Sequence, residues 1–572
     1  MKKCIVYIFA LALQASTVLF AQDLSNLSSQ KPVTLSGGIG AGTQFYSSNE
    51  PYKSRDPFIW NLNGNVTANI YSVSLPFSFV INQYSKSYST PFSQFGLSPT
   101  YKWATLHLGY RSMELSPLIF GGQSFLGAGI ELHPGKFSFT GFYGRLNKAI
   151  SEDTTFDHRI EPQYSRVGYG FKFGFGKPEA SINLSFFHAS DKEKSIADII
   201  DTLNTLRPQE NSVLGLGWAY TFFKKLSFNG DLALSLLNRD KTYGALDSIG
   251  HYEVPKFVRS FTPINESSVL SYSARTELSL QLTDFNASTI YQRIQPDYIS
   301  LGTPYTVNDL ETISLAASGN LLKGHLNLSG AYSTQHNNLE HALSTELLAQ
   351  SGNLSINANL NKHLNLNVNI NGAKVLQKDG LIVLNDSLRM DQLMLNYSFS
   401  PSYVSSTDIQ QHTLSASINY TDLKDNNPAT AVAAAGNNIN LSASYGLQFI
   451  KAFKGITVGL NHSVYGQKDY RYYSTGLHIG GNAQFLKAHN WNLQGDIGYF
   501  FNRTNGATVG NNTTFSLSSG YSLHKHSLSL YSSYTITPPV YLNPLDKVNL
   551  SRIPYAVNTR NLSGGITYGY QF

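Results

Sequence analysis

The residue types that carry most protein chemistry are sparse or poorly spaced in this chain. The single cysteine is Cys4, and the 15 histidines are scattered, with no Cys/His cluster at the spacing of metal ligands. His524 and His526 flank a lysine in a short turn, which a solvated turn explains better than a metal site. Ser and Asn are so frequent that spacing singles out no catalytic constellation. We therefore predict no catalytic, cofactor-binding or metal-binding residue, no cofactor and no enzymatic activity.

Two further features also fail to indicate a familiar ligand. Gly38, Gly40 and Gly42 superficially resemble a nucleotide-binding loop, but their spacing is two and no helical pattern follows, so we interpret them as one smooth strand face. The net charge is only +6, which gives no reason to expect a nucleic-acid partner.

The elements that position these residues have a period of two. Residues 363–371 read HLNLNVNIN, with leucine, valine and isoleucine on one face and asparagine on the other. Residues 60–70 and 353–360 repeat the pattern, which predicts strands because a helix would mix the two faces. Charged residues are 14%, aromatic residues 13% and the mean hydropathy is −0.18, which together exclude a charged coiled coil, a disordered chain and a bundle of membrane helices.

The first residues predict export. Lys2 and Lys3 precede an apolar stretch that ends near Ala21, which is typical of a secretory signal peptide over 1–21; a retained membrane anchor is the alternative. Cleavage would remove the only cysteine, so the mature chain would contain no disulfide. We expect a short periplasmic segment over 22–31 and a barrel over 32–572. The segment 22–31 is too short for a plug domain.

The alternating segments fit a closed transmembrane β-barrel better than a soluble sandwich. They are about ten residues or longer, continue without a domain break, and carry Asn, Ser, Gly and Gln on the polar face. Tight turns alternate with longer polar connections. A chain that enters and leaves the barrel on the same side must cross the membrane an even number of times, which requires an extra strand at 91–98, turning at Pro99. We therefore predict an all-β, single antiparallel barrel of about 26 strands (24–28) without a plug domain.

The inner face of this barrel should hold the candidate functional residues. Alternation places His107, Arg111 and Glu131 in the lumen, and likewise Arg275 and Glu277. We expect Arg111 and Glu131 to pair near a connection over 113–122 that folds inward beside glycines. A salt bridge that only neutralises inward charge is the simpler interpretation of this pair, and it applies equally to Arg275 and Glu277, which share an inward face on another strand.

The last strand, 561–572, predicts how the barrel is assembled. Tyr568, Tyr570 and the terminal Phe572 share one face. This resembles the C-terminal insertion signal of outer-membrane barrels, which implies the barrel-assembly machinery as a partner during biogenesis.

One region also resembles a known family. FGLSPTYKWATLHLGYRSM at 95–113, GQSFLGAGIELHPGKF at 122–137 and YGRL at 143–146 are similar to a family of large outer-membrane barrels of Bacteroidota-type bacteria. The match covers residues 92–148. The resemblance implies an outer-membrane location and a barrel fold, and it transfers no site residue.

A barrel of 26 strands would be roughly 50 Å across the backbone. Because an open hole of this width would abolish the membrane barrier, we expect inward loops or a separate partner to fill the lumen, with the connections 191–209 and 239–266 as modest fillers. The leading hypothesis is a channel or translocation conduit of the Gram-negative outer membrane, in contact with its lipid. The alternatives are a non-conducting scaffold that anchors surface lipoproteins or matrix, and a soluble secreted adhesin.

Overall fold

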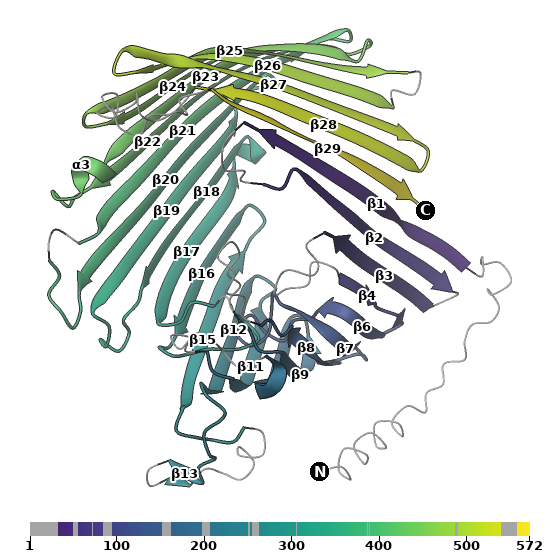
Figure 1. The fold of residues 1–572 in the computed structure, drawn as a ribbon, viewed down its shortest axis with the longest axis vertical. Helices are drawn as coiled ribbons and strands as arrows, with labels where there is room; N and C mark the ends of the chain where they lie inside the picture. Colours follow the sequence, from purple (N-terminus) through teal and green to yellow (C-terminus); the bar gives the residue numbers. More distant parts are fainter. Residues whose placement is uncertain are drawn as a thin grey trace.

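The computed structural model is one large antiparallel sheet that closes on itself (Figure 1). It describes residues 33–49, 55–70, 73–83, 94–151, 162–196, 206–249, 252–253, 262–304, 306–385, 387, 389–486, 490–538 and 558–572. The predicted signal peptide and the segment 22–31 lie outside these residues. The strands of the sheet are β1 (Val33–Ser48), β2 (Phe58–Ile70), β3 (Val73–Asn82), β4 (Gln94–Leu97), β5 (Thr100–Tyr101), β6 (Ala104–Ser112), β7 (Ser124–Leu132), β8 (Phe137–Asn147), β9 (Arg166–Lys177), β10 (Ala180–Asp191), β11 (Glu210–Phe222), β12 (Leu226–Asn238), β15 (Ser268–Gln281), β16 (Phe285–Ile294), β17 (Leu310–Leu321), β18 (Leu326–His336), β19 (Thr345–Asn359), β20 (Leu364–Asp379), β21 (Asp391–Ser406), β22 (Gln410–Asp425), β23 (Gly436–Phe449), β24 (Lys454–Gln467), β25 (Tyr470–Phe485), β26 (Trp491–Thr504), β27 (Ala507–Leu523), β28 (His526–Thr537) and β29 (Thr559–Gln571).

Helical structure is minor in the described chain. It comprises α3 (Ala431–Ala434) and short 3-10 turns at Glu193–Ser195 and Leu322–Gly324. A small hairpin of β13 (Ser248–Ile249) and β14 (Tyr252–Glu253) stands apart from the main sheet.

The sheet closes where β1 meets β29. Their antiparallel register runs from Gly38 opposite Gln571 to Ser48 opposite Asn561, and Figure 1 shows the two strands side by side. In the described residues, β4 and β5 both pair with β3 and β6, so these two short strands form one crossing and the sheet has 26 positions. The predicted fold and strand number are therefore confirmed.

The extra crossing predicted at 91–98 is present in its described part, 94–98, but its turn lies further on; residues 91–93 lie outside the described residues. The crossing continues past Pro99 into β5, and Lys102, in the left-handed backbone conformation at φ 51°, makes the turn into β6. A proline removes one donor from the sheet without ending the crossing, because Ser98 N still donates to Pro76 O and Leu106 N to Pro99 O, each at 2.9 Å.

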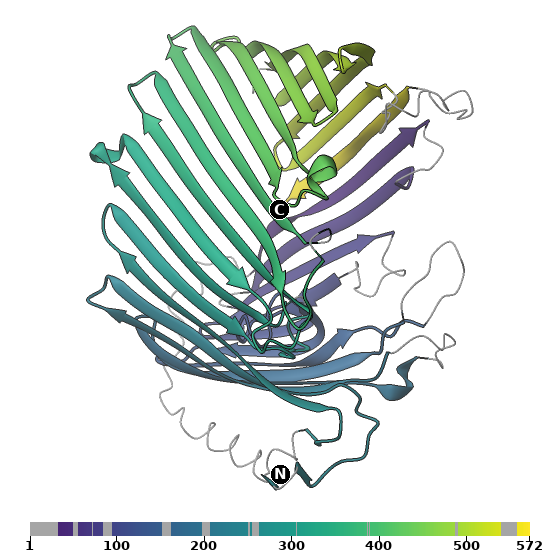
Figure 2. The ribbon, with the colours of Figure 1, turned by 90° about the vertical axis from the view of Figure 1, so that its left-hand side faces the viewer.

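Alternation along each strand separates two environments. Leu477, Ile479 and Ile497 on the outer face are each more than half exposed, an arrangement typical of a surface that contacts lipid. Aromatic pairs such as Phe485–Trp491 and Tyr570–Phe572, with ring centroids 5.2 and 5.3 Å apart, lie at the ends with short turns. Figure 2 shows the strands slanting across the wall, as closure of a sheet into a barrel requires.

The described residues contain no separately folded plug domain. One side of the lumen is instead filled by two connections from the end with longer loops, 113–123 and 295–309. Their buried apolar side chains, together with inward side chains of β7 to β16, form one cluster that we call the lumen core: Met113, Leu115, Leu118, Ile119, Phe120, Phe125, Phe142, Leu146, Phe187, Ala189, Val213, Ala233, Leu237, Ile294, Tyr298 and Leu301.

Candidate functional site in the barrel lumen

The connection 113–123 folds into the lumen because inward glycines leave space for it. A Cβ atom on Gly129 would lie 2.3 Å from Met113 Sδ, and one on Gly215 would lie 2.0 Å from Ile119 Cδ1. Non-bonded heavy atoms of this size normally stay about 3.5 to 4 Å apart, so a side chain at either position would force the Met113 or Ile119 side chain to move. The predicted inward fold of this connection is thus explained by the wall itself.

Phe120 anchors this segment. It is fully buried, and its ring centroid lies 4.3 Å from that of Phe142 and 5.4 Å from that of Phe187. Phe125 stacks on Phe142 at 4.7 Å. Aromatic packing of this extent gives the segment a fixed position against the wall rather than a loose one.

The connection after β16 covers the first segment and is hydrogen-bonded to it. Tyr298 Oη donates to Leu118 O at 2.7 Å, and Ser300 Oγ donates to Ile119 O at 2.5 Å. Burial raises the pKa of Tyr298, so its phenol stays protonated and remains a donor. Asn211 holds the other side, since its Oδ1 accepts from Leu301 N at 3.1 Å and its Nδ2 donates to Ser235 Oγ at 2.8 Å.

Alternation with exposed Leu106 and Leu108 places His107 and Arg111 on the inner face of β6. The expected pair of Arg111 with Glu131 does not form. The register sets Glu131 opposite Thr105 and Arg111 opposite Phe125, so the two charges are three inward positions apart. The Arg111 guanidinium donates instead to Ser78 Oγ at 2.6 Å, while Glu131 lies nearest to His107, with 3.7 Å between Oε2 and Nε2.

A serine, a histidine and a carboxylate lie one after the other on this part of the wall, as in a hydrolytic triad: Ser98, His107 and Glu131. Ser98 Oγ lies 2.9 Å from His107 Nδ1, but 3.7 Å between His107 and Glu131 is too long for a hydrogen bond. The same Ser–His distance, 2.9 Å, recurs at His188 and Ser212 on the outer face, where no solute passes. We therefore interpret the serine–histidine contact as cross-strand bonding of the wall.

Arg275 and Glu277 lie on the inner face of β15 and form an ion pair with 3.5 Å between Nη2 and Oε2. Asp231 is opposite Arg275 in the register, and its Oδ1 accepts from Ser116 Oγ of the inward segment at 3.0 Å. Arg275, Glu277 and Asp231 thus have partners in the wall or in the inward connections. This geometry suits neutralisation of inward charge.

The remaining inner face, from β17 to β29 and on through β1 and β2, is lined largely by uncharged polar groups, and we call it the polar wall. Hydroxyls pair across strands, as at Ser415–Ser444 and Ser417–Ser442, both at 2.7 Å. In the described strands of the polar wall, alternation places only these charged side chains inward: Asp379 and Asp425 at strand ends, and Asp496, whose Oδ2 lies 3.4 Å from His478 Nδ1.

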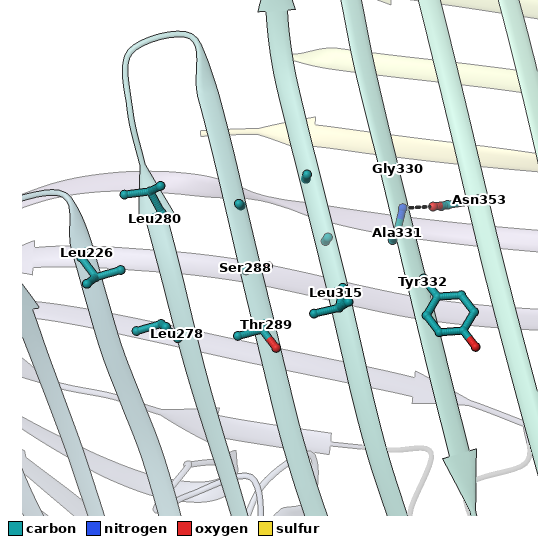
Figure 3. Close-up of a pocket in the computed structure, with 13 residues that line it drawn as sticks. Leu226, Leu278, Leu280, Ser288, Thr289, Leu315, Gly330, Ala331, Tyr332 and Asn353 are labelled. Atoms are coloured by element: carbon teal, nitrogen blue, oxygen red, sulfur yellow. Dashed lines mark hydrogen bonds between the residues drawn. The ribbon is translucent and has the colours of Figure 1, made fainter.

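The wall is thin at the adjacent strands β16, β17 and β18, because small side chains lie opposite each other there. On the outer face, Ala287, Ala317 and Gly330 share one row of the register and leave an apolar hollow of about 720 Å³. Figure 3 shows large side chains around it, including Leu280, Leu315 and Tyr332.

Two inner hollows, of about 480 and 430 Å³, lie behind this part of the wall. Both are lined by Ser288, Ala316, Ala331 and Asn353, and we call them together the trough. The Asn353 side chain is fixed because its Oδ1 accepts from Ala331 N at 2.7 Å, the dashed line in Figure 3.

The C-terminal residues lie at the seam. Tyr568 and Tyr570 pair with Ala41 and Ile39 of β1, and Phe572 N donates to Gly37 O at 2.9 Å. Their side chains alternate with the inward Thr567 and Gly569. These residues therefore help to close the sheet, whether or not they also act as an insertion signal.

Most of the contacts that hold the lumen core are not visible in the sequence pattern. The inward glycines of β7 are visible in the sequence pattern, and so is the series Gly168, Gly170, Gly174 and Gly176 on the inner face of β9, but what Gly170 and Gly215 make room for is not. Of the predicted fillers 191–209 and 239–266, residues 197–205, 250–251 and 254–261 lie outside the described residues. Asn211 carries no sequence signal because its role depends on contacts with the distant residues Ile299 and Leu301.

The described residues contain no helix long and apolar enough to cross a membrane. They also contain no group of three or more His, Cys, Asp or Glu side chains placed to hold a metal ion.

Comparisons with known proteins find similarity only among solved structures. No protein-family model and no curated protein sequence matches the chain. The P pilus usher PapC translocation pore is similar with a TM-score of 0.38 and 10% identity, covering 94% of this chain and 99% of PapC. OpdQ of Pseudomonas aeruginosa has a TM-score of 0.34 and 11% identity, covering 60% and 93%, and the copper transporter OprC has 0.37 and 8%, covering 94% and 80%. At these scores the fold assignment rests on the strand register described above.

Proposed function

We propose that this protein is an outer-membrane channel or translocation conduit whose lumen is narrowed by its own inward connections. The observation that carries the proposal is the contrast between the two faces of one closed sheet. An outer face with this many exposed Leu, Ile and Phe side chains suits lipid, and the polar wall on the inner face from β17 to β2 suits water and a polar cargo.

The lumen core supports passage rather than occlusion by a folded domain. It packs against β7 to β16, and none of its residues belongs to the polar wall from β17 to β2. A wide barrel with one filled side and one polar side retains a path while limiting its cross-section. A separate protein in the remaining space, or at the surface, is compatible with the same geometry.

Location and assembly are parts of the same proposal. The signal-peptide pattern over 1–21 and the family resemblance of 92–148 support export to the outer membrane of a Gram-negative bacterium. The shared face of Tyr568, Tyr570 and Phe572 supports recognition by the barrel-assembly machinery.

The test is single-channel recording of the purified, refolded protein in planar lipid bilayers. Preparations are first checked for a folded barrel by the shift in electrophoretic mobility between unheated and heated samples. We expect stable conductance steps. A folded barrel that never conducts, after any copurified partner is removed, would reject the conduit and favour the non-conducting scaffold.

A further inference from the structure

The trough is formed by one row of the register that crosses several strands. The row contains, in spatial order, Ser288, Ala316, Ala331, Asn353, Asn371 and Asn396. The three small side chains at its start lower the floor, and the three asparagines at its end stand beside that floor. The result is a recess in the lumen wall with a side lined by carboxamides.

The side chains of this recess offer both hydrogen-bond donors and hydrogen-bond acceptors. Each carboxamide offers two N–H donors and an acceptor oxygen, and each serine hydroxyl both donates and accepts. Asn353 uses its oxygen on Ala331 N, so its amide nitrogen is available to a solute. Sugar hydroxyls have the same dual character, so that a carbohydrate can exchange its bonds with water for bonds with the wall.

The charge distribution argues against an ionic cargo. At the edge of the trough, Glu277 is paired with Arg275, and beyond it the row continues through the uncharged Thr421 and Asn438. An ion that enters such a recess loses hydration and gains no opposite charge in return. An uncharged solute loses less, since the serine and asparagine side chains of the row can form hydrogen bonds with it.

We infer that the trough binds a neutral glycan as it passes through the lumen; this inference rests on the proposed conduit function. The glycan lies along the polar wall and is held by the carboxamides of the row. Binding is weak at each sugar and repeated along the chain, because rows of Asn and Ser continue above and below the trough.

The inference is tested with the full-length barrel in planar bilayers. Three probes of matched length are added: a linear dextran oligosaccharide, dextran sulfate, and an unfolded polypeptide. Dextran should block the current reversibly at lower concentration than the other two probes. The triple variant N353L/N371L/N396L should weaken dextran binding about tenfold or more, the effect expected when hydrogen bonds of roughly 1 kcal/mol each are lost. The control triple variant N440L/N461L/N492L alters inward asparagines outside the trough and should block like the wild type.

The outcomes separate the two proposals. Three results would overturn the glycan inference and leave the conduit proposal intact. The barrel conducts but dextran does not block it selectively; dextran sulfate or the polypeptide blocks it more strongly than dextran does; or dextran blocks the trough variant and the control variant equally. A barrel that does not conduct would reject the conduit. Calorimetric titration of dextran into the detergent-solubilised barrel then decides whether the trough binds glycan at all.

Discussion

Replacing Gly215 by alanine should destabilise the barrel, although alanine is normally the better residue in a strand. The added Cβ would lie 2.0 Å from Ile119 Cδ1 and 3.3 Å from its Cγ1. Ile119 is only 1% exposed and packs within the lumen core, so moving its side chain aside would disturb that packing. Overpacking of this kind costs about 1–3 kcal/mol.

A double-mutant cycle isolates the contact. Ile119→Ala alone should cost about 2–5 kcal/mol through lost burial and a cavity. In the double variant, the new methyl at position 215 occupies part of that cavity, and the total cost should fall below the sum of the single costs by about 1–3 kcal/mol. Gly446→Ala is the matched control, because its Cβ on the polar wall would meet nothing closer than Thr457 Oγ1 at 3.7 Å. It should be neutral or stabilise by up to about 1 kcal/mol.

The assay is urea unfolding of the protein reconstituted in lipid vesicles, followed by the fluorescence of its 4 tryptophans. The unheated electrophoretic mobility of each variant confirms that it has folded before titration. The reasoning is refuted if Gly215→Ala unfolds at the same urea concentration as Gly446→Ala, or if the cycle is additive to within about 0.5 kcal/mol.

Three further predictions address other parts of the lumen and the seam. Asn211→Ala should lower the free energy of unfolding by about 2–4 kcal/mol in the same titration, because Ser235 Oγ and Leu301 N lose a buried partner. The control Asn440→Ala, on the polar wall, should change that free energy by less than about 0.5 kcal/mol. Equal effects of the two variants would contradict the proposed role of Asn211. Arg275→Gln should leave Glu277 unpaired in the lumen and shift the reversal potential under a salt gradient towards cation selectivity. Combining it with Glu277→Gln should restore the wild-type reversal potential. If the single variant has the same reversal potential as the wild type, the ion pair lies away from the path of the ions. Phe572→Ala should reduce the amount of barrel assembled in cells while leaving spontaneous refolding in detergent almost unchanged, and equal losses in both assays would indicate that Phe572 acts only by closing the seam.

The pattern of single residues was enough to predict the barrel. HLNLNVNIN at 363–371 can separate its apolar and polar side chains only as a strand, and an even number of crossings required a strand near 91–98. The structure places β4 at Gln94–Leu97 as part of that crossing. The end of the crossing was predicted less well, because a proline interrupts hydrogen bonding locally while the crossing continues into β5.

Which charged side chains form ion pairs was harder to predict than which face of the sheet they lie on. Alternation put Arg111 and Glu131 on the inner face, but only the register between β6 and β7 determines which residues are opposite each other. Arg275 and Glu277 share one strand, so their proximity followed from spacing alone, and they do form an ion pair.

The sequence by itself determined which side chains face lipid and which face the lumen, because that choice depends on a local period of two. Only the tertiary structure decided how the lumen is filled. Ile119, Gly215 and Leu301 are far apart in the chain, and their fit depends on the closure of the wall and on the direction in which two connections fold. Such contacts depend on the shapes and volumes of side chains that are distant in the sequence. The alternation of apolar and polar residues along one strand carries no information about either.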